Sequence, residues 1–242
     1  DVNGFYLYIG RSGGGGMRLV RPISPLSYGT VTYTGGTWGD VIDVSFDQGQ
    51  NVYALNKLSG TSNVLKLQSD GSGNATVIAT YNLPASKTPK QMVYDGKYFW
   101  VAMDAATGAD TVARLDPVTS TVKEYYLTNN GLSSGIAQCA DPVGIAFDGG
   151  LVWLSCATVS AGGQKTLVRV NTTTGALVPW NTDGSNNYTL SVNNGTPVGD
   201  IVFDGTYIWV ATNSTDTLRK YYSGFGTGGY ARPWATSGIN VY

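Results

Sequence analysis

The chain has 242 residues, of which 42% are hydrophobic and only 13% charged, and its formal net charge is −1. It can bury one large core, but its scattered charges argue against nucleic acid as a partner, and its strand-length apolar runs argue against membrane insertion. Histidine is absent, which excludes Ser-His-Asp units, Cys-His units and histidine-bound metals, so we expect no metal and no cofactor.

Five related segments recur along the chain and set its architecture. Three of them share an aromatic residue, an Asp-Gly turn and a strand with a central tryptophan, at 94–102, 147–155 and 203–211. Degenerate copies lie at 3–10 and 46–55. The copies begin near residues 2, 46, 94, 147 and 203, and a spacing in the forties to fifties is typical of propeller blades.

Each copy predicts the same order of strands and turns. In the third copy we expect strands at 91–94, 111–115 and 122–126 beside the tryptophan strand, and in the fourth copy at 142–147 and 166–170. No stretch of twelve residues has the apolar spacing of a helix. The predicted fold class is therefore all-β, a β-propeller of about five four-stranded blades, an architecture that protects sheet edges.

The two ends of the chain predict how the ring closes. The first copy lacks an innermost strand, and residues 238–242 have the apolar alternation that such a strand needs. We expect Ile239, Val241 and Tyr242 to form a closure strand that pairs with the first blade, either within one chain or between two chains. The predicted single domain, 1–242, has blades at 1–36 with 238–242, 37–84, 85–128, 129–190 and 191–237.

The segment Phe-Asp-Gly-Thr-Tyr-Ile-Trp-Val-Ala at 203–211 resembles the blade signature of the NHL and YVTN-like propeller superfamily. The resemblance covers nearly the whole chain and implies the propeller fold. It leaves function open, because such propellers serve as enzymes, scaffolds and adhesive heads. Streptogramin lyases share this kind of propeller, but their chemistry depends on histidine, so the resemblance argues against that activity here.

The repeated aspartates and tryptophans have structural explanations. Asp95, Asp148 and Asp204 are expected to be turn residues spread around the rim of one face, too far apart for paired acid–base chemistry. The alternative for the tryptophans is a set of sugar-stacking platforms, but their equivalent positions favour packing between blades. These tryptophans are Trp100, Trp153 and Trp209. The better candidates for exposed aromatic surface are Tyr125, Tyr126, Tyr221 and Tyr222.

Catalytic groups are sparse. Glutamate occurs once, at Glu124, so a propeller glycosidase site would need two aspartates to converge at the central channel. The loosely placed aspartates are Asp110, Asp141 and Asp200. We therefore predict that the chain has no catalytic residues and is not an enzyme.

The cysteines and sequons point to an oxidising compartment. Cys139 and Cys156 form either a disulfide or two buried thiols; the fourth copy places residue 156 opposite residue 142, which favours the disulfide. Five Asn-x-Ser/Thr sequons lie in predicted loops or turns, where a glycosyltransferase could reach them, at Asn74, Asn171, Asn187, Asn194 and Asn213.

These features together predict a non-enzymatic extracellular protein. We expect a structural or adhesive module of a cell or virion surface, with glycans, surface proteins or copies of itself as partners. Its long loops at 127–141 and 178–198 would gather on one face beside those at 103–110 and 157–165. The alternatives are a sugar-binding lectin propeller and a secreted hydrolase or lyase.

Overall fold

The computed structural model describes 20 β-strands in five sheets, and no helix occurs among its described residues. Sheet 1 contains β1 (Leu7–Gly10), β2 (Met17–Arg21) and β3 (Ser27–Thr30). Sheet 2 contains β4 (Tyr33–Thr34), β5 (Asp40–Phe46), β6 (Val52–Lys57), β7 (Asn63–Ser69) and β8 (Ala75–Asn82). Sheet 3 contains β9 (Lys87–Tyr94), β10 (Phe99–Ala105), β11 (Thr111–Asp116) and β12 (Thr121–Tyr126). Sheet 4 contains β13 (Ala140–Phe147), β14 (Leu151–Thr158), β15 (Thr166–Asn171) and β16 (Leu190–Ser191). Sheet 5 contains β17 (Pro197–Phe203), β18 (Tyr207–Thr212), β19 (Thr217–Tyr222) and β20 (Ile239–Asn240).

The described residues are 7–10, 17–21, 27–30, 33–69, 74–105, 110–128, 130–132, 134, 137–158, 166–180, 189–191, 197–212, 217–223 and 239–240. In their all-β composition, and in the antiparallel order of sheets 3, 4 and 5, they agree with the sequence prediction. Sheet 2 has a fifth strand, because β4 pairs in parallel with the outer strand β8.

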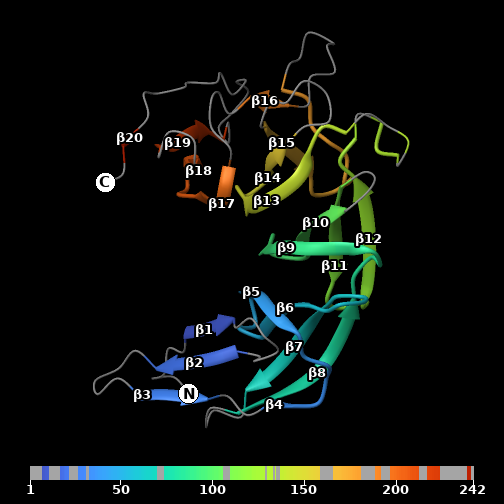
Figure 1. Ribbon diagram of the computed structural model, residues 1–242, viewed down its shortest axis with the longest axis vertical. Coiled ribbons are helices and arrows are strands. Elements are labelled where there is room, and N and C mark those ends of the chain that lie inside the picture. The colour runs from blue at the N-terminus through green and yellow to red at the C-terminus, as the bar shows by residue number, and fades with distance from the viewer. Residues whose placement is uncertain are drawn as a thin grey trace.

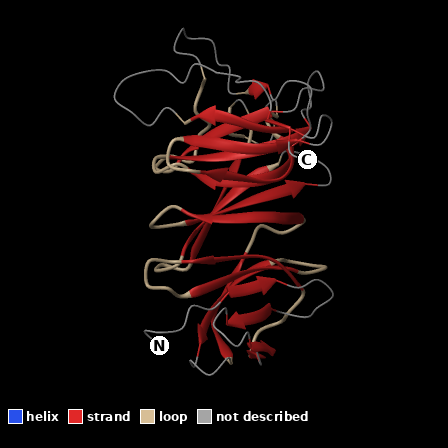
Figure 2. Ribbon diagram, turned by 90° about the vertical axis from the view of Figure 1, so that its left-hand side faces the viewer, coloured by secondary structure: helices blue, strands red, loops and turns tan. Residues whose placement is uncertain are grey.

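The sheets follow one another in chain order along an arc (Figure 1), and from the side they form successive layers (Figure 2). The first strand of the repeated unit forms one edge of its sheet; it is β5 in sheet 2, β9 in sheet 3, β13 in sheet 4 and β17 in sheet 5. Each of these strands contacts the next, and β1 contacts β5. The arc is open, and in the part of the chain that the structure describes no strand of sheet 5 pairs with sheet 1.

The closure prediction is therefore wrong for the described part of the C-terminal strand. Ile239 pairs with Leu218 and Asn240 with Thr217, so β20 adds to the edge of sheet 5 instead of sheet 1. Without β20, sheet 5 would end at β19 with an unpaired edge. Residues 239–240, which follow β19 in the chain, cover that edge. Val241 and Tyr242 lie outside the described residues.

The core lies between sheets as well as within them. Trp100 of sheet 3 is fully buried in a cluster that includes Ile145 and Leu154 of sheet 4. Trp153 of sheet 4 is fully buried beside Ile201 of sheet 5. Each tryptophan thus joins its own sheet to the following one, and much of the hydrophobic stabilisation depends on the stacking of neighbouring sheets.

One aspartate organises each Asp-Gly turn. The Oδ1 atom of Asp148 accepts hydrogen bonds from the backbone N–H groups of Gly150 and Leu151, and its Oδ2 atom accepts one from the indole N–H of Trp153 at 2.7 Å. Gly149 has a φ of 100°, which favours glycine at this turn. The carboxylate therefore fixes the turn and the orientation of the ring together.

A cation completes this unit from the neighbouring strand. In sheets 2 to 5 the residue paired with the ring residue is Arg or Lys, and its charged group lies 5.5–5.7 Å from the ring centroid, within cation–π range. In sheet 2 a tyrosine replaces tryptophan, and its hydroxyl donates to the carboxylate at 3.1 Å. The units are Asp47–Tyr53–Lys66, Asp95–Trp100–Arg114, Asp148–Trp153–Arg169 and Asp204–Trp209–Lys220.

Two hydrogen bonds tie first strands of successive sheets together. The Asp43 carboxylate accepts the backbone N–H of Met92 at 2.7 Å, and the Gln91 side-chain carbonyl accepts that of Ile145 at 2.8 Å. Asp43 and Gln91 both stand four residues before the turn aspartate of their copy. Asp200 stands at the equivalent position in β17.

The disulfide prediction is confirmed. Cys139 and Cys156 are bonded, and both are fully buried in the cluster between sheets 3 and 4. The bond anchors the segment that leads into β13 onto β14.

A Cβ atom at Gly175 would overlap the ring of Tyr125, and Gly175 has a φ of 75°, so the turn after β15 requires glycine on both counts.

We predict that Trp153→Phe destabilises the protein by about 1–3 kcal/mol more than Trp100→Phe, because it leaves the Asp148 carboxylate buried without its indole donor. Both rings are fully buried, so the ring change is matched, whereas Asp148 is 3% exposed and Asp95 is more accessible to water. Urea unfolding of the two variants measures the difference. Equal losses would contradict the role given to the indole N–H.

We predict that replacing both Cys139 and Cys156 by serine lowers the free energy of unfolding by about 3 kcal/mol, because the bond closes a loop across a sequence separation of 17. Chemical denaturation of the double variant and of the native protein gives this number. A double variant as stable as the native protein would contradict it.

Candidate active site

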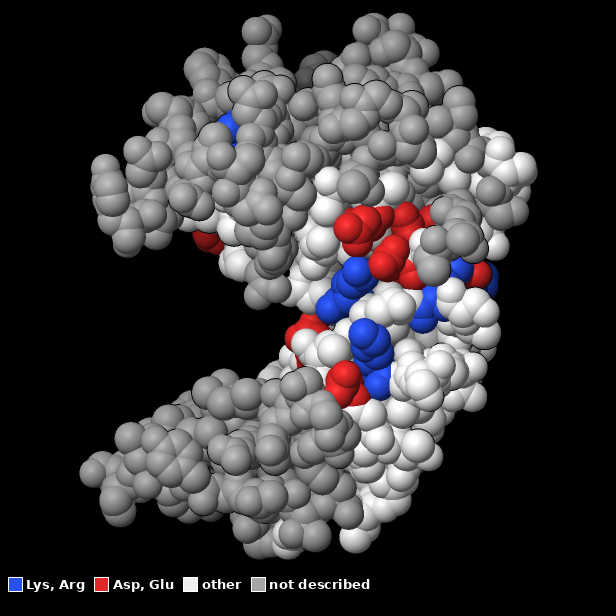
Figure 3. Space-filling view, viewed as in Figure 1, with Lys and Arg blue, Asp and Glu red and all other residues white. Residues whose placement is uncertain are grey.

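Charged side chains gather near the middle of the arc, beside its hollow (Figure 3). Among the described charged residues, Lys90 has its Nζ atom 2.9 Å from Asp104 Oδ2 and 3.2 Å from Asp141 Oδ1. These residues come from β9, the end of β10 and the start of β13, so the site joins two sheets.

A β-bulge places Lys90. In the pairing of β9 with β10, Gln91 faces Ala102 and Pro89 faces Met103, so Lys90 is the extra residue of the bulge. Pro89 has no N–H to donate to the ladder, which suits this interruption. Bulges re-aim side chains, and this one directs the lysine toward carboxylates beyond its own strand.

Lys90 is held in its charged form. Partial burial opposes the ammonium charge, but the hydrogen bonds to Asp104 and Asp141 outweigh it and raise the pKa of Lys90. An ammonium has three N–H donors, so these two contacts leave one for a further acceptor.

Asp110 is a buried carboxylate that positions the backbone of the site. It is only 4% exposed, and its carboxylate accepts the backbone N–H groups of Ala105 at 2.6 Å and Asp141 at 2.9 Å. Burial raises the pKa of Asp110 despite these two hydrogen bonds. Ala105 follows Asp104 in the chain, so the Asp110 carboxylate is hydrogen-bonded to the backbone beside Asp104 and to that of Asp141. It therefore helps to position both carboxylates that contact Lys90.

Asp141 has a backbone conformation that is uncommon for a residue with a side chain. Its φ is 51°, and its N–H bond to Asp110 holds it there. Non-glycine residues in this region are found where the surrounding structure dictates them, often at functional sites. The side chain of Asp141 is 42% exposed and that of Asp104 is 27% exposed, so Asp141 is the more open to water.

A second ion pair flanks the first. Lys87 Nζ lies 2.9 Å from Glu124 Oε1 and 5.0 Å from the ring centroid of Tyr126, and the hydroxyl of Thr111 donates to Glu124.

Among the described residues, no group of three or more carboxylates, cysteines or histidines is arranged to hold a metal ion, and no helix could span a membrane.

The structure brings together two of the three aspartates that the sequence suggested for a channel site. Asp110 and Asp141 are hydrogen-bonded to each other, whereas Asp200 lies in β17 and its side chain is outside the described residues. Sequence reasoning missed Lys90 and Asp104. The available signal for Lys90 was Pro89, since a proline inside a first strand indicates a bulge.

The other candidates are distributed over the molecule. Asp95, Asp148 and Asp204 each cap a turn and hold a tryptophan, and they are not brought together at the Lys90 site. Tyr222 is 36% exposed, Tyr221 is 5% exposed, and Tyr125 and Tyr126 are half-buried. Asn74 is exposed, and Asn171 accepts the N–H groups of Thr173 and Thr174; the other predicted glycosylation sites, Asn187, Asn194 and Asn213, lie outside the described residues.

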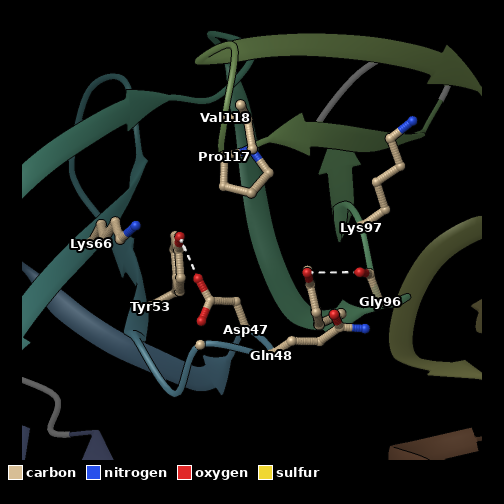
Figure 4. Close-up of a pocket in the computed structure, with 10 residues that line it drawn as sticks. Asp47, Gln48, Tyr53, Lys66, Gly96, Lys97, Pro117 and Val118 are labelled. Carbon is tan, nitrogen blue, oxygen red and sulfur yellow. Dashed lines mark hydrogen bonds between the residues drawn. The ribbon is translucent and has the colours of Figure 1, made fainter.

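A separate cavity of about 260 Å³ lies between sheets 2 and 3 (Figure 4). It is lined by residues of the turns that follow β5, β9 and β11, at the other end of β9 from Lys90. In the figure, Lys66 points toward Tyr53 and Asp47 on one side, and Pro117 and Val118 form the other side. Lys97 extends away from Asp47.

The repeat explains this cavity. Between sheets 3 and 4 the equivalent space holds Arg114, whose Nη1 donates to the carbonyl oxygens of Thr172 at 3.0 Å and Thr173 at 3.3 Å. Between sheets 2 and 3 the shorter Lys66 stands at the position of Arg114, and Tyr53 stands at that of Trp100. Two smaller side chains leave the gap unfilled, so a packing difference accounts for the cavity.

We predict that Lys66→Arg stabilises the protein by about 0.5–2 kcal/mol, because the guanidinium fills the gap and reaches the carbonyl groups of the facing turn. Arg114→Lys should have the opposite effect. Thermal or urea unfolding measures both, with Lys123→Arg on the exposed side of β12 as the control for an added guanidinium. A Lys66→Arg variant no more stable than this control would contradict the packing explanation.

The chain matches no known family model and no curated protein. Among solved structures, it is similar to a periplasmic gluconolactonase of Pseudomonas aeruginosa, with 12% identity, a TM-score of 0.67 and coverage of 99% of this chain and 69% of that one. It is also similar to proposed 6-phosphogluconolactonases of Bacteroides uniformis (12% identity, TM-score 0.65, 98% and 68% coverage) and Bacteroides fragilis (14%, 0.61, 98% and 69%).

These similarities support the propeller prediction at the level of the fold, with no support for the particular NHL or YVTN-like repeat. The prediction of a non-enzymatic structural or adhesive module is contradicted, because these neighbours over almost the whole chain bear the names of lactonases. The prediction that the chain is not an enzyme is contradicted by the same finding. At 12–14% identity the likeness itself shows a propeller-like fold and nothing finer.

Proposed function

We propose that this protein is a lactonase that hydrolyses a sugar lactone at the Lys90 site. The observation that carries the proposal is the position of Lys90 between the carboxylates of Asp104 and Asp141, which come from two neighbouring sheets. Hydrolysis of a cyclic ester needs a base that activates water and a positive group beside the carbonyl oxygen, and this cluster contains both. The names of the similar structures agree with this reaction class.

In the proposed reaction Asp141 is the general base. Its carboxylate takes a proton from water while the water oxygen attacks the carbonyl carbon of the lactone. The oxyanion that forms accepts a hydrogen bond from the remaining N–H donor of Lys90. When the carbonyl reforms, the bond between the acyl carbon and the ring oxygen breaks. The proton held by Asp141 passes to the ring oxygen, and an open-chain hydroxy acid leaves.

Asp104 and Asp110 have supporting roles in this proposal. Asp104 orients the Lys90 ammonium and keeps it charged. Asp110 is a positioning residue, because it acts through the backbone N–H of Asp141 and through Ala105. The disulfide beside this site supports an oxidising location, such as the periplasm or the extracellular space.

We expect the purified protein to hydrolyse a gluconolactone well above its spontaneous rate in buffer, as followed by acid release with a pH indicator. Asp141→Asn should lower kcat/KM by about 10²–10⁴-fold through loss of the base. Lys90→Met should lower it by about 10²–10³-fold through loss of the oxyanion donor.

The matched control is Lys123→Met, which removes an exposed lysine of β12 and should leave the rate unchanged. Circular dichroism and a melting curve establish that each variant is folded. Full activity in Asp141→Asn would refute its role as the base. If native protein is no faster than buffer with either a neutral or a phosphorylated gluconolactone, the proposed function is wrong.

A further inference from the structure

The lysines of the site already have anionic partners. Lys90 forms ion pairs with Asp104 and Asp141. Lys87 forms an ion pair with Glu124, and its Nζ atom lies over the ring of Tyr126. The side chain of Lys87 is only 12% exposed. The positive charge of each ammonium is thus already balanced by at least one carboxylate, so neither lysine supplies an uncompensated charge for an added dianion.

The surrounding charge is negative in balance. Among the described residues, four carboxyl groups and two ammonium groups make up the site: Asp104, Asp110, Glu124 and Asp141 against Lys87 and Lys90. On the neighbouring sheet the exposed Lys57 stands opposite Asp40 in the pairing of β5 with β6, which adds one charge of each sign. Asp43 adds a further carboxylate in β5.

A phosphate group carries a charge of about −1.5 to −2 at neutral pH, and like charges at close range penalise binding strongly. The hydroxyl groups of an unmodified sugar are hydrogen-bond donors, and ionised carboxylates are acceptors only, so the same side chains favour a neutral, hydroxyl-bearing ligand. The two names among the similar structures differ in this respect, since one substrate is phosphorylated and the other is not.

We propose that the site selects an uncharged polyhydroxylated lactone and discriminates against its phosphorylated counterpart. The inference rests on the proposed lactonase function and specifies its substrate class. The Lys87–Glu124 ion pair contributes to the discrimination against the phosphorylated lactone, because Glu124 neutralises the positive charge that Lys87 would otherwise offer to a phosphate group.

The test compares kcat/KM for glucono-1,5-lactone and its 6-phosphate with the native protein, each corrected for spontaneous hydrolysis. We expect the neutral lactone to be preferred by at least about tenfold at low salt, and the preference to shrink as added salt screens the repulsion. Equal rates or a preference for the phosphorylated lactone would overturn the inference and leave the lactonase function standing. Hydrolysis of neither would overturn the function itself and the inference with it.

Glu124→Gln tests the cause of the selectivity. This variant removes the carboxylate that forms an ion pair with Lys87, so we expect kcat/KM for the phosphorylated lactone to rise several-fold and the preference for the neutral one to narrow. Asp116→Asn is the matched control, because it also removes one negative charge but lies at the turn between β11 and β12, where it pairs with Thr121, whereas Glu124 pairs with Ala113 farther from that turn. An unchanged preference in Glu124→Gln, or an equal change in the control, would overturn the role of the Lys87–Glu124 pair.

Discussion

The carboxylate of the turn aspartate is the group on which sheets 2 to 5 of this protein depend. It binds the backbone of its own turn with one oxygen and the ring residue of the next strand with the other, and a cation from the third strand covers that ring. The ring in turn packs against the following sheet. One residue thus connects turn geometry, ring orientation and sheet stacking, so a change in it is felt in two sheets at once.

Variation within this unit has visible consequences. The unit with Tyr53 and Lys66 is smaller than its neighbours, and a cavity lies beside it. The unit with Trp153 and Arg169 is the most buried, and there burial lowers the pKa of Arg169 to about 10, although the charge of Asp148 opposes the change. Removal of water from the guanidinium favours its neutral form, whereas Asp148 favours its charged form.

The proposed site uses the geometry of the repeat with side chains that do not repeat. The first strands of sheets 2, 3 and 4 each have an irregularity five residues before the turn aspartate, where Ile42, Lys90 and Val143 stand. Lys90 is the charged residue of the three, and Asp104 and Asp141 lie within its reach. The scaffold supplies equivalent positions in each sheet, and a polar substitution at one of them creates a candidate site.

The sequence alone was sufficient for the all-β class and the hairpins around each Asp-Gly turn, and it favoured the disulfide over two buried thiols, because alternation, turn chemistry and repeat spacing are local or periodic. The tertiary structure decided where Ile239 pairs, because β19 has an edge that only the folded sheet reveals. It also decided that Lys90 meets Asp104 and Asp141, because a bulge and the stacking of two sheets set that contact, and neither leaves a regular pattern in the chain.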